Sequence, residues 1–251
     1  MPALLGWMLS LLLAARWATA AEPGGGKPLQ VLLITGGCCH NYPFQSGQLT
    51  NALARKTPAA WTVVQAGGNG TRAQIPLYDR ADWAKGYDVV VHNECFADTQ
   101  DPAYIRRITD THRAGVPAVV IHCAMHTYRA TDIGDWREFL GVTSRHHEHQ
   151  SRYPVKKVRP GHPILAGMPD NWVTPKDELY IVEKAWPGVT VLATSDSELG
   201  SHASQPVIWT HQFGQARVFG TTYGHSDDTF RDPVFLDYVT RGLLWAAGRL
   251  E

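Results

Sequence analysis

The chain has 251 residues, of which 44% are hydrophobic and 18% are charged, a composition typical of a globular protein. Lysine plus arginine number 23, as do aspartate plus glutamate, so the formal net charge is zero. This balance removes the usual electrostatic basis for binding nucleic acid or an anionic membrane surface. We therefore expect a small-molecule ligand and no nucleic-acid partner, and the oligomeric state stays open.

The first twenty residues have the pattern of a signal peptide. Leu4 to Ala15 is an apolar run that is short for a bilayer span, and an A-x-A cleavage site follows at 18–20. The alternative is an N-terminal membrane anchor, which the short run disfavours. We expect removal of 1–20, a flexible lead-in over 21–28 and one domain over 29–251. The mature protein would then be secreted or periplasmic and have no membrane span.

Strand and helix patterns alternate in the first half of the domain. Near-continuous apolar runs indicate strands buried on both faces. We predict strands at 29–35, 61–66, 87–93 and 116–122, and helices at 44–56 and between Asp101 and Gly115. Asp101 is the expected N-cap of the second helix, and Pro102 suits its first position. This order predicts a mostly parallel sheet with helices on both faces.

The second half has a different pattern, with little helix between its strands. We predict strands at 153–158, 178–184 and 189–194, a hairpin of 206–210 with 216–222, and a closing helix over 233–249. The expected fold is α/β: an open, doubly wound, three-layer arrangement whose later strands run partly antiparallel.

Polar residues gather where four of the predicted strands end. In open α/β sheets, ligands bind outside the carboxyl ends of the strands. The four segments are Gly36–Asn41, His92–Cys95, His122–His126 and Tyr223–Asp228. We expect them to form one site.

The first and third strand ends offer groups that suit substrate binding. Gly36 and Gly37 allow a tight turn and a close approach of the backbone to a ligand, although a simple turn explains them equally well. The G-x-G-x-x-G spacing of a dinucleotide site is missing. His40 can donate to a substrate oxygen or bind a metal. Asn93 and Glu94 are candidate substrate-binding residues.

The fourth strand runs into Cys123 and resembles an elbow that presents a nucleophile. His225 and Asp227 would complete a Cys–His–Asp arrangement. The alternative is that Cys123 is a small buried residue. A bridge between Cys95 and Cys123 is also conceivable, whereas the adjacent Cys38 and Cys39 are not expected to form an ordinary bridge together.

Histidines also cluster at 145–150. The segment lacks the H-E-x-x-H pattern of a helical zinc site but offers one or two metal ligands; the alternative is a polar loop. We take His40, His122 and His149 as candidate ligands of a divalent metal such as zinc. His147 and Glu178 are candidate substrate-binding residues, although Glu178 could simply cap its strand.

An ordered set of short motifs resembles the trehalose-utilisation (ThuA-like) family. The match runs from about Leu29 to the C-terminus, and no single motif is specific. The motifs are Thr35-Gly36-Gly37 with His40, Ile121–His126, His162-Pro163-Ile164 with Gly167-Met168-Pro169, Asp177–Tyr180, Pro206–Trp209, Gly214 with Arg217-Val218, Gly224-His225, and Gly242 with Trp245–Gly248.

The resemblance implies a flavodoxin-like fold of the class I glutamine amidotransferase-like type. Cys123, His225 and Asp227 fall where the catalytic Cys, His and Glu of that superfamily would lie. Ile121 and Met125, however, replace the glycines of its nucleophile elbow. Members of the ThuA-like family often lack the cysteine, and no synthetase domain is attached to receive ammonia. Glutamine hydrolysis is therefore not expected.

The family is linked to the catabolism of disaccharides, notably trehalose, and of sugars oxidised at the 3-position. A 3-keto-glycoside can be cleaved by elimination, which needs a base, a group that stabilises the enolate and, in some designs, a divalent metal. We expect His126 and His225 to act in catalysis, with a histidine-centred site acting on keto-glycosides or related disaccharides. The alternatives are a carbohydrate-binding protein without catalysis and a thiol hydrolase that uses Cys123.

Overall fold

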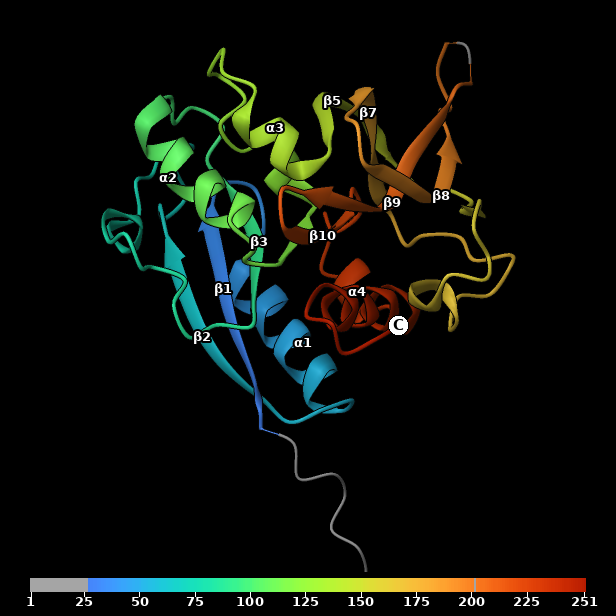
Figure 1. Cartoon of the computed structure of the whole chain (residues 1–251). Helices are drawn as coiled ribbons and strands as arrows, with labels where there is room; N and C mark the ends of the chain where they lie inside the picture. The colour runs from blue at the N-terminus through green and yellow to red at the C-terminus, as the bar shows by residue number, and fades with distance from the viewer. Residues whose placement is uncertain (1–26, 201) are drawn as a thin grey trace, which may run out of the picture.

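A mixed sheet of eight strands forms the centre of the molecule (Figure 1). The computed structural model describes residues 27–200 and 202–251. The expected signal peptide, the alternative anchor and most of the lead-in lie outside these residues. Within the described residues, no helix has the length and apolarity needed to cross a membrane.

One half of the sheet is parallel and the other half is antiparallel. Its order is β2-β1-β3-β4-β10-β9-β8-β6. The parallel strands are β1 (Leu29–Gly37), β2 (Ala59–Ala66), β3 (Val89–Cys95), β4 (Ala118–Ile121) and β10 (Ala216–Thr221). The antiparallel strands that follow are β9 (Ser204–Phe213), β8 (Val189–Asp196) and the two-residue β6 (Lys156–Lys157). This arrangement confirms the expected α/β fold with antiparallel additions in the C-terminal half.

Helices cover both faces of the parallel half. They are α1 (Tyr42–Ala54), α2 (Pro102–Arg113), α3 (Asp135–Leu140) and α4 (Pro233–Ala246), with short 3₁₀ turns η1 (Pro76–Asp79), η2 (His122–Met125), η3 (Pro163–Leu165) and η4 (Thr229–Arg231). Val31 and Leu33 of β1 belong to the core shared with α1 and α4, whereas Leu32 and Ile34 belong to the core shared with α2 and α3. Because successive side chains of a strand point to opposite faces, one apolar run supplies both cores.

The local signals for the helix ends are correct. The carboxylate of Asp101 accepts hydrogen bonds from the backbone N–H groups of Ala103 (2.9 Å) and Tyr104 (3.2 Å), and Pro102 occupies the first turn of α2. Asp232 caps α4 in the same way, although the sequence analysis did not single it out. These caps satisfy N–H groups that have no partner inside the helix.

A separate two-stranded sheet corrects the view of the second half. β5 (Val142–Ser151) pairs antiparallel with β7 (Asp177–Ala185), outside the main sheet. The histidine cluster at 145–150 is therefore part of a strand and not a polar loop. The predicted strand at 153–158 shrinks to β6, because an isolated bridge at Pro154 and a turn take up the rest.

Candidate functional site

A cavity of about 340 Å³ lies over the ends of β1, β3 and β4, beside the β5–β7 sheet. It collects residues from the predicted strand ends and from both strands of the small sheet. Its lining residues are Cys38, Cys39, His40, Thr71, Cys95, Ala97, Cys123, His126, Arg129, His147, Glu178, Tyr180 and His225. A hollow of about 430 Å³ between Arg72 and Gln100 contains no histidine or cysteine. We therefore take the first cavity as the candidate site.

Glu178 is the carboxylate around which the imidazoles gather. Its Oε2 lies 3.4 Å from Nε2 of His147 and 3.6 Å from Nε2 of His122. Its Oε1 lies 3.3 Å from Nδ1 of His225. Among the residues that line the cavity, it is the only carboxylate. The site thus has one acidic group in contact with three potential proton donors.

Glu178 and His225 shift each other's pKa. Burial raises the pKa of Glu178, but its contacts with His225, His147 and Gln150 together outweigh this effect and leave the pKa below the usual value. Burial lowers the pKa of His225, but the carboxylate of Glu178 outweighs that and leaves the pKa above the usual value. Both shifts favour the charged pair, as expected for opposite charges in contact.

The loop that carries His225 is anchored by the residue next to Glu178. The buried carboxylate of Asp177 accepts hydrogen bonds from the backbone N–H groups of Gly224 (3.0 Å) and His225 (3.3 Å) and from the hydroxyl of Thr229 (2.6 Å). Burial raises the pKa of Asp177 to about 6, although these hydrogen bonds oppose the shift. β7 thereby fixes the position of the imidazole relative to Glu178.

Asp227 does not take the role that the sequence suggested. Its carboxylate accepts a hydrogen bond from the side-chain amide of Asn41 (3.0 Å) and lies 3.9 Å from Arg231. The carboxylates that contact residue 225 are instead Glu178, at the ring, and Asp177, at the backbone N–H. Two residues of separation along the chain did not place Asp227 against the imidazole, because the loop turns away after 225.

Three imidazoles meet at one end of the cavity. Ring nitrogens of His40, His122 and His225 lie within 4.8 Å of one another and could hold a metal ion. Burial lowers the pKa of His40 to about 4 and that of His122 well below its usual value. His149 does not join them, because it lies on the exposed side of β5, where its Nε2 is 2.9 Å from Glu198. His149 therefore lies apart from the other two candidate metal ligands, His40 and His122.

Aromatic rings form a stack beside Glu178. The rings of His126 and Tyr180 are 4.1 Å apart and nearly parallel, at 7°, and His147 lies 5.5 Å from the same tyrosine. Burial lowers the pKa of His126 to about 3. Its Nε2 is buried and has no hydrogen-bond partner within the described protein. The ring is therefore uncharged, and one of its nitrogens is buried without a hydrogen bond.

Two residues of this site escaped the sequence analysis. Tyr180 stands two residues after Glu178 on β7, and side chains two apart on a strand share a face. This spacing could have identified it. The side-chain nitrogen of Gln150 lies 2.7 Å from Nε2 of His225. No local signal marks Gln150, because its position depends on the pairing of β5 with β7.

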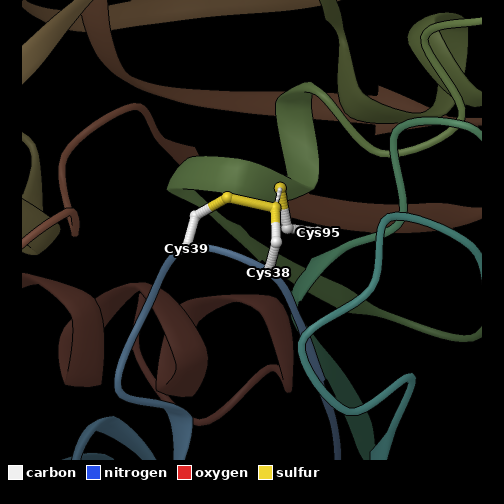
Figure 2. A group of neighbouring side chains, drawn as sticks. All are labelled: Cys38, Cys39 and Cys95. Atoms are coloured by element: carbon white, nitrogen blue, oxygen red, sulfur yellow. Dashed lines mark hydrogen bonds between the residues drawn. A yellow bond between two sulfur atoms is a disulfide. The ribbon is translucent and has the colours of Figure 1, made fainter.

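Two disulfides form the sulfur-rich wall of the cavity. Cys38 bridges Cys39, and Cys95 bridges Cys123. Figure 2 shows the first pair with Cys95 beside it, and the sulfurs of Cys38 and Cys95 are 3.9 Å apart. The expectation that the adjacent cysteines would not bridge is wrong: Cys39 has a positive φ of 84° in a turning loop.

The bridge also removes the proposed cysteine nucleophile. The sulfur of Cys123 is bonded to Cys95, so it carries no thiolate, and only a thiolate is an effective nucleophile. The Cys–His–Asp arrangement therefore lacks both its first and its third member. Of the residues expected in catalysis, His126 and His225 line the cavity and are not bridged.

The two glycines after β1 serve packing and do not line the cavity. Both have positive φ values, 120° at Gly36 and 97° at Gly37. A Cβ at Gly36 would lie 2.1 Å from the carbonyl oxygen of Ala66, and one at Gly37 would lie 2.4 Å from that of Cys95. Close approach to neighbouring strands therefore explains both glycines.

Asn93 and Glu94 also lie away from the cavity, beneath the sheet edge. Asn93 donates to the side chain of Gln45 (3.0 Å), and Glu94 pairs with Nδ1 of His92 (2.9 Å). Burial raises the pKa of Glu94 well above its usual value and lowers that of His92 to about 3, which keeps both groups uncharged. These polar groups belong to the core and not to the candidate site.

Comparisons with known proteins agree with this architecture. The family model for trehalose utilisation, ThuA, matches residues 35–246. A ThuA-like protein from Parabacteroides merdae shares 22% identity at a TM-score of 0.70, with 89% of this chain and 92% of that chain covered. A ThuA-like protein from Bacteroides uniformis shares 16% identity at a TM-score of 0.65, with 89% and 96% covered.

A more distant likeness extends to part of a larger protein. A β-galactosidase from Bacillus circulans shares 12% identity at a TM-score of 0.56, with 86% of this chain but 31% of that chain covered. Such identities show the fold alone. No curated protein matches the chain. From the family match over most of its length and the fold it shares with two ThuA-like structures, the chain belongs to the trehalose-utilisation (ThuA-like) family.

Proposed function

We propose that this chain is an exported enzyme that cleaves 3-keto-glycosides derived from disaccharides such as trehalose. The observation that carries the proposal is the position of Glu178, the one carboxylate of the cavity, in contact with His122, His147 and His225. A family linked to disaccharide catabolism supports a sugar as the substrate. The signal-peptide pattern and the two disulfides support export, because disulfides persist in oxidising compartments.

The chemistry follows from the acidity of the proton next to the ketone. The carboxylate of Glu178 removes this proton, and the electron pair forms a carbon–carbon double bond as the glycosidic C–O bond breaks. The departing oxygen takes a proton from His147, whose Nε2 is 3.4 Å from Glu178. The proton taken by Glu178 then returns to His147. One alcohol and one unsaturated keto-sugar result, so no redox partner is required.

The cavity suits a sugar in size and in character. Its volume of about 340 Å³ falls within the range of roughly 300–1,000 Å³ that is usual for small-molecule sites. Its lining includes the four cysteines of the two disulfides, whose sulfurs are largely apolar, and also the polar side chains of Glu178, His147 and Arg129. A pyranose has apolar C–H faces and polar edges, so it complements both parts of the lining.

A turnover assay with two matched variants tests the proposal. Trehalose and its 3-keto derivative are incubated with the wild type, with Glu178→Gln and with Glu183→Gln, and the products are followed by NMR. Glu183 lies on the same strand and pairs with Arg145 at the surface. We expect cleavage of the keto-sugar alone, a loss of roughly 10²–10⁴-fold in Glu178→Gln and near-normal rates in Glu183→Gln.

Two results would decide against the proposal. Undiminished cleavage by Glu178→Gln would remove the assigned base. Sugar binding by calorimetry without cleavage, over long incubation of the wild type, would identify a carbohydrate-binding protein instead.

A further inference from the structure

We propose that His40, His122 and His225 bind one divalent transition-metal ion at the end of the cavity. The three come from the ends of three different strands, β1, β4 and β10. Imidazole nitrogens suit Zn²⁺, Co²⁺, Ni²⁺ and Cu²⁺, and a three-histidine set with an open position is a known arrangement for catalytic zinc. The ion would share the cavity of the proposed function, but its binding can be tested without any sugar.

The spacing of the rings is close to what an ion requires. One nitrogen from each ring lies within 4.8 Å of the other two. Tetrahedral zinc with bonds of about 2.0–2.1 Å holds its nitrogen ligands roughly 3.3 Å apart. The rings therefore need to close by at most about 1.5 Å, which small side-chain rotations supply. The three rings are already in edge-on contact, with centroids 4.9 to 5.5 Å apart.

Hydrogen bonds fix the tautomers of two rings in the form that binds metal. Nδ1 of His122 donates to the carbonyl oxygen of Thr222 (2.7 Å), and Nδ1 of His40 donates to that of His225 (3.1 Å). A carbonyl oxygen only accepts, so Nδ1 carries the proton and Nε2 carries the lone pair. Histidine ligands of metals almost always have such a partner on their second nitrogen.

Two of the ring nitrogens near this point lack a short, well-aligned hydrogen bond. The hydroxyl of Tyr180 lies 3.4 Å from Nε2 of His122, which is long for a hydrogen bond. Nδ1 of His225 is buried and has no well-aligned hydrogen-bond partner among the described residues, although Glu178 lies 3.3 Å away. A bound cation would accept the lone pairs of His40 and His122 and would replace the proton that Glu178 favours on His225.

The location gives the ion one open side. His122 is buried at 1% exposure, whereas His40 and His225 line the cavity. An ion held by the three would sit at the cavity floor and face the space where Glu178 lies. A cation at this place would stabilise negative charge on a substrate oxygen next to the base.

A second cluster makes a competing ligand set. His40, Cys95 and Cys123 also approach one another within 4.8 Å. The two sulfurs are bridged, so they are not thiolate ligands unless the bridge is reduced. Cobalt spectra separate the two sets, because thiolate ligands add a charge-transfer band in the near ultraviolet and imidazole ligands do not.

The test uses the full protein, treated with a chelator, dialysed without reductant and titrated with ZnCl₂ or CoCl₂ alone. We expect one equivalent to bind by calorimetry, and a cobalt spectrum without a thiolate band. His40→Ala and His225→Ala should each weaken binding at least about tenfold. His149→Ala, on the exposed side of β5, is the matched control and should bind as the wild type does. Circular dichroism verifies that each variant is folded.

The proposal is wrong if the wild type binds no stoichiometric metal, if both alanine variants bind as tightly as the control, or if the cobalt complex has a thiolate band. Its failure is distinguishable from that of the proposed function. Metal binding without sugar cleavage would remove the reaction and leave the metal site. Cleavage by protein that binds no metal would remove the metal site and leave the reaction.

Discussion

Removal of the bridge between Cys95 and Cys123 should destabilise the fold strongly. This bridge joins the end of β3 to the η2 turn after β4, 28 residues apart in sequence. Both cysteines are buried, at 4% and 6% exposure. The double variant Cys95→Ala/Cys123→Ala removes the link and leaves no free thiol at this position.

The magnitude follows from the entropy of the unfolded chain. A bridge that closes a loop of 28 residues restricts the unfolded ensemble and so raises the free energy of unfolding by roughly 3–4 kcal/mol. Cys38 and Cys39 are adjacent, so their bridge closes almost no loop. The double variant Cys38→Ala/Cys39→Ala should therefore lose much less, and it serves as the control.

Urea unfolding, followed by tryptophan fluorescence at neutral pH without reductant, measures both differences. We expect the first double variant to unfold at a clearly lower urea concentration than the wild type, and the control variant to stay close to the wild type. Equal midpoints for the first variant and the wild type would refute the reasoning. So would four titratable thiols in the unreduced wild type after denaturation.

Three further perturbations test the packing and the polar core. Gly220→Ala should lower the free energy of unfolding in urea by about 1–3 kcal/mol, because the new Cβ would lie 2.2 Å from a buried indole of β9. The control Gly47→Ala in α1 places its Cβ within 4 Å of no atom, so it should be neutral or stabilising. Similar losses in the two variants would contradict this prediction. Burial lowers the pKa of His112 to about 3, so the unfolded chain binds a proton at this residue at a higher pH than the folded protein does. Between pH 7 and pH 5, the free energy of unfolding of the wild type should therefore fall by roughly 2 kcal/mol relative to that of His112→Gln. Parallel pH profiles of the two proteins would oppose this prediction. Asp177→Ala should lower the free energy of unfolding by roughly 2–4 kcal/mol, because it leaves buried hydrogen-bond donors unpaired. Asp227→Ala, whose hydrogen bond is exposed, should lower it by less than about 1 kcal/mol. Equal losses would show that Asp177 does not anchor the loop that carries His225.

Signals carried by neighbouring residues predicted much of the fold. The apolar run of β1 indicated a strand buried on both faces, and its residues do enter two cores. Asp101 and Pro102 marked the start of α2, where the cap is observed. Because the carboxyl ends of parallel strands meet at one edge, the gathering of His40, His126 and His225 was expected from their positions after predicted strand ends.

Such local signals did not predict the contacts between segments that are distant in the sequence. The pairing of β5 with β7 sets His147 opposite Tyr180 and Gln150 opposite Glu178, and no periodicity in either segment encodes that register. The same holds for Asp177, whose partners lie 47 to 52 residues away.

Residue type alone also did not decide the roles of the cysteines or of the buried acidic residue Glu94. A cysteine at a strand end suits a nucleophile, a core residue or a bridge, and only the spatial neighbour of Cys123 decides among them. Glu94 has the residue type of a catalytic acid but points into the core, where it meets His92. Residue type at a strand end thus indicated the region of the site and not each member.

The most direct test of the catalytic role of Glu178 is proton exchange at the carbon next to the ketone of a 3-keto-glucoside in deuterated water, followed by proton NMR. The wild type should replace this proton with deuterium well above the buffer rate, and Glu178→Gln should not exceed that rate. Exchange by Glu178→Gln at the wild-type rate, or no enzymatic exchange at all, would contradict the assignment of this carboxylate as the base.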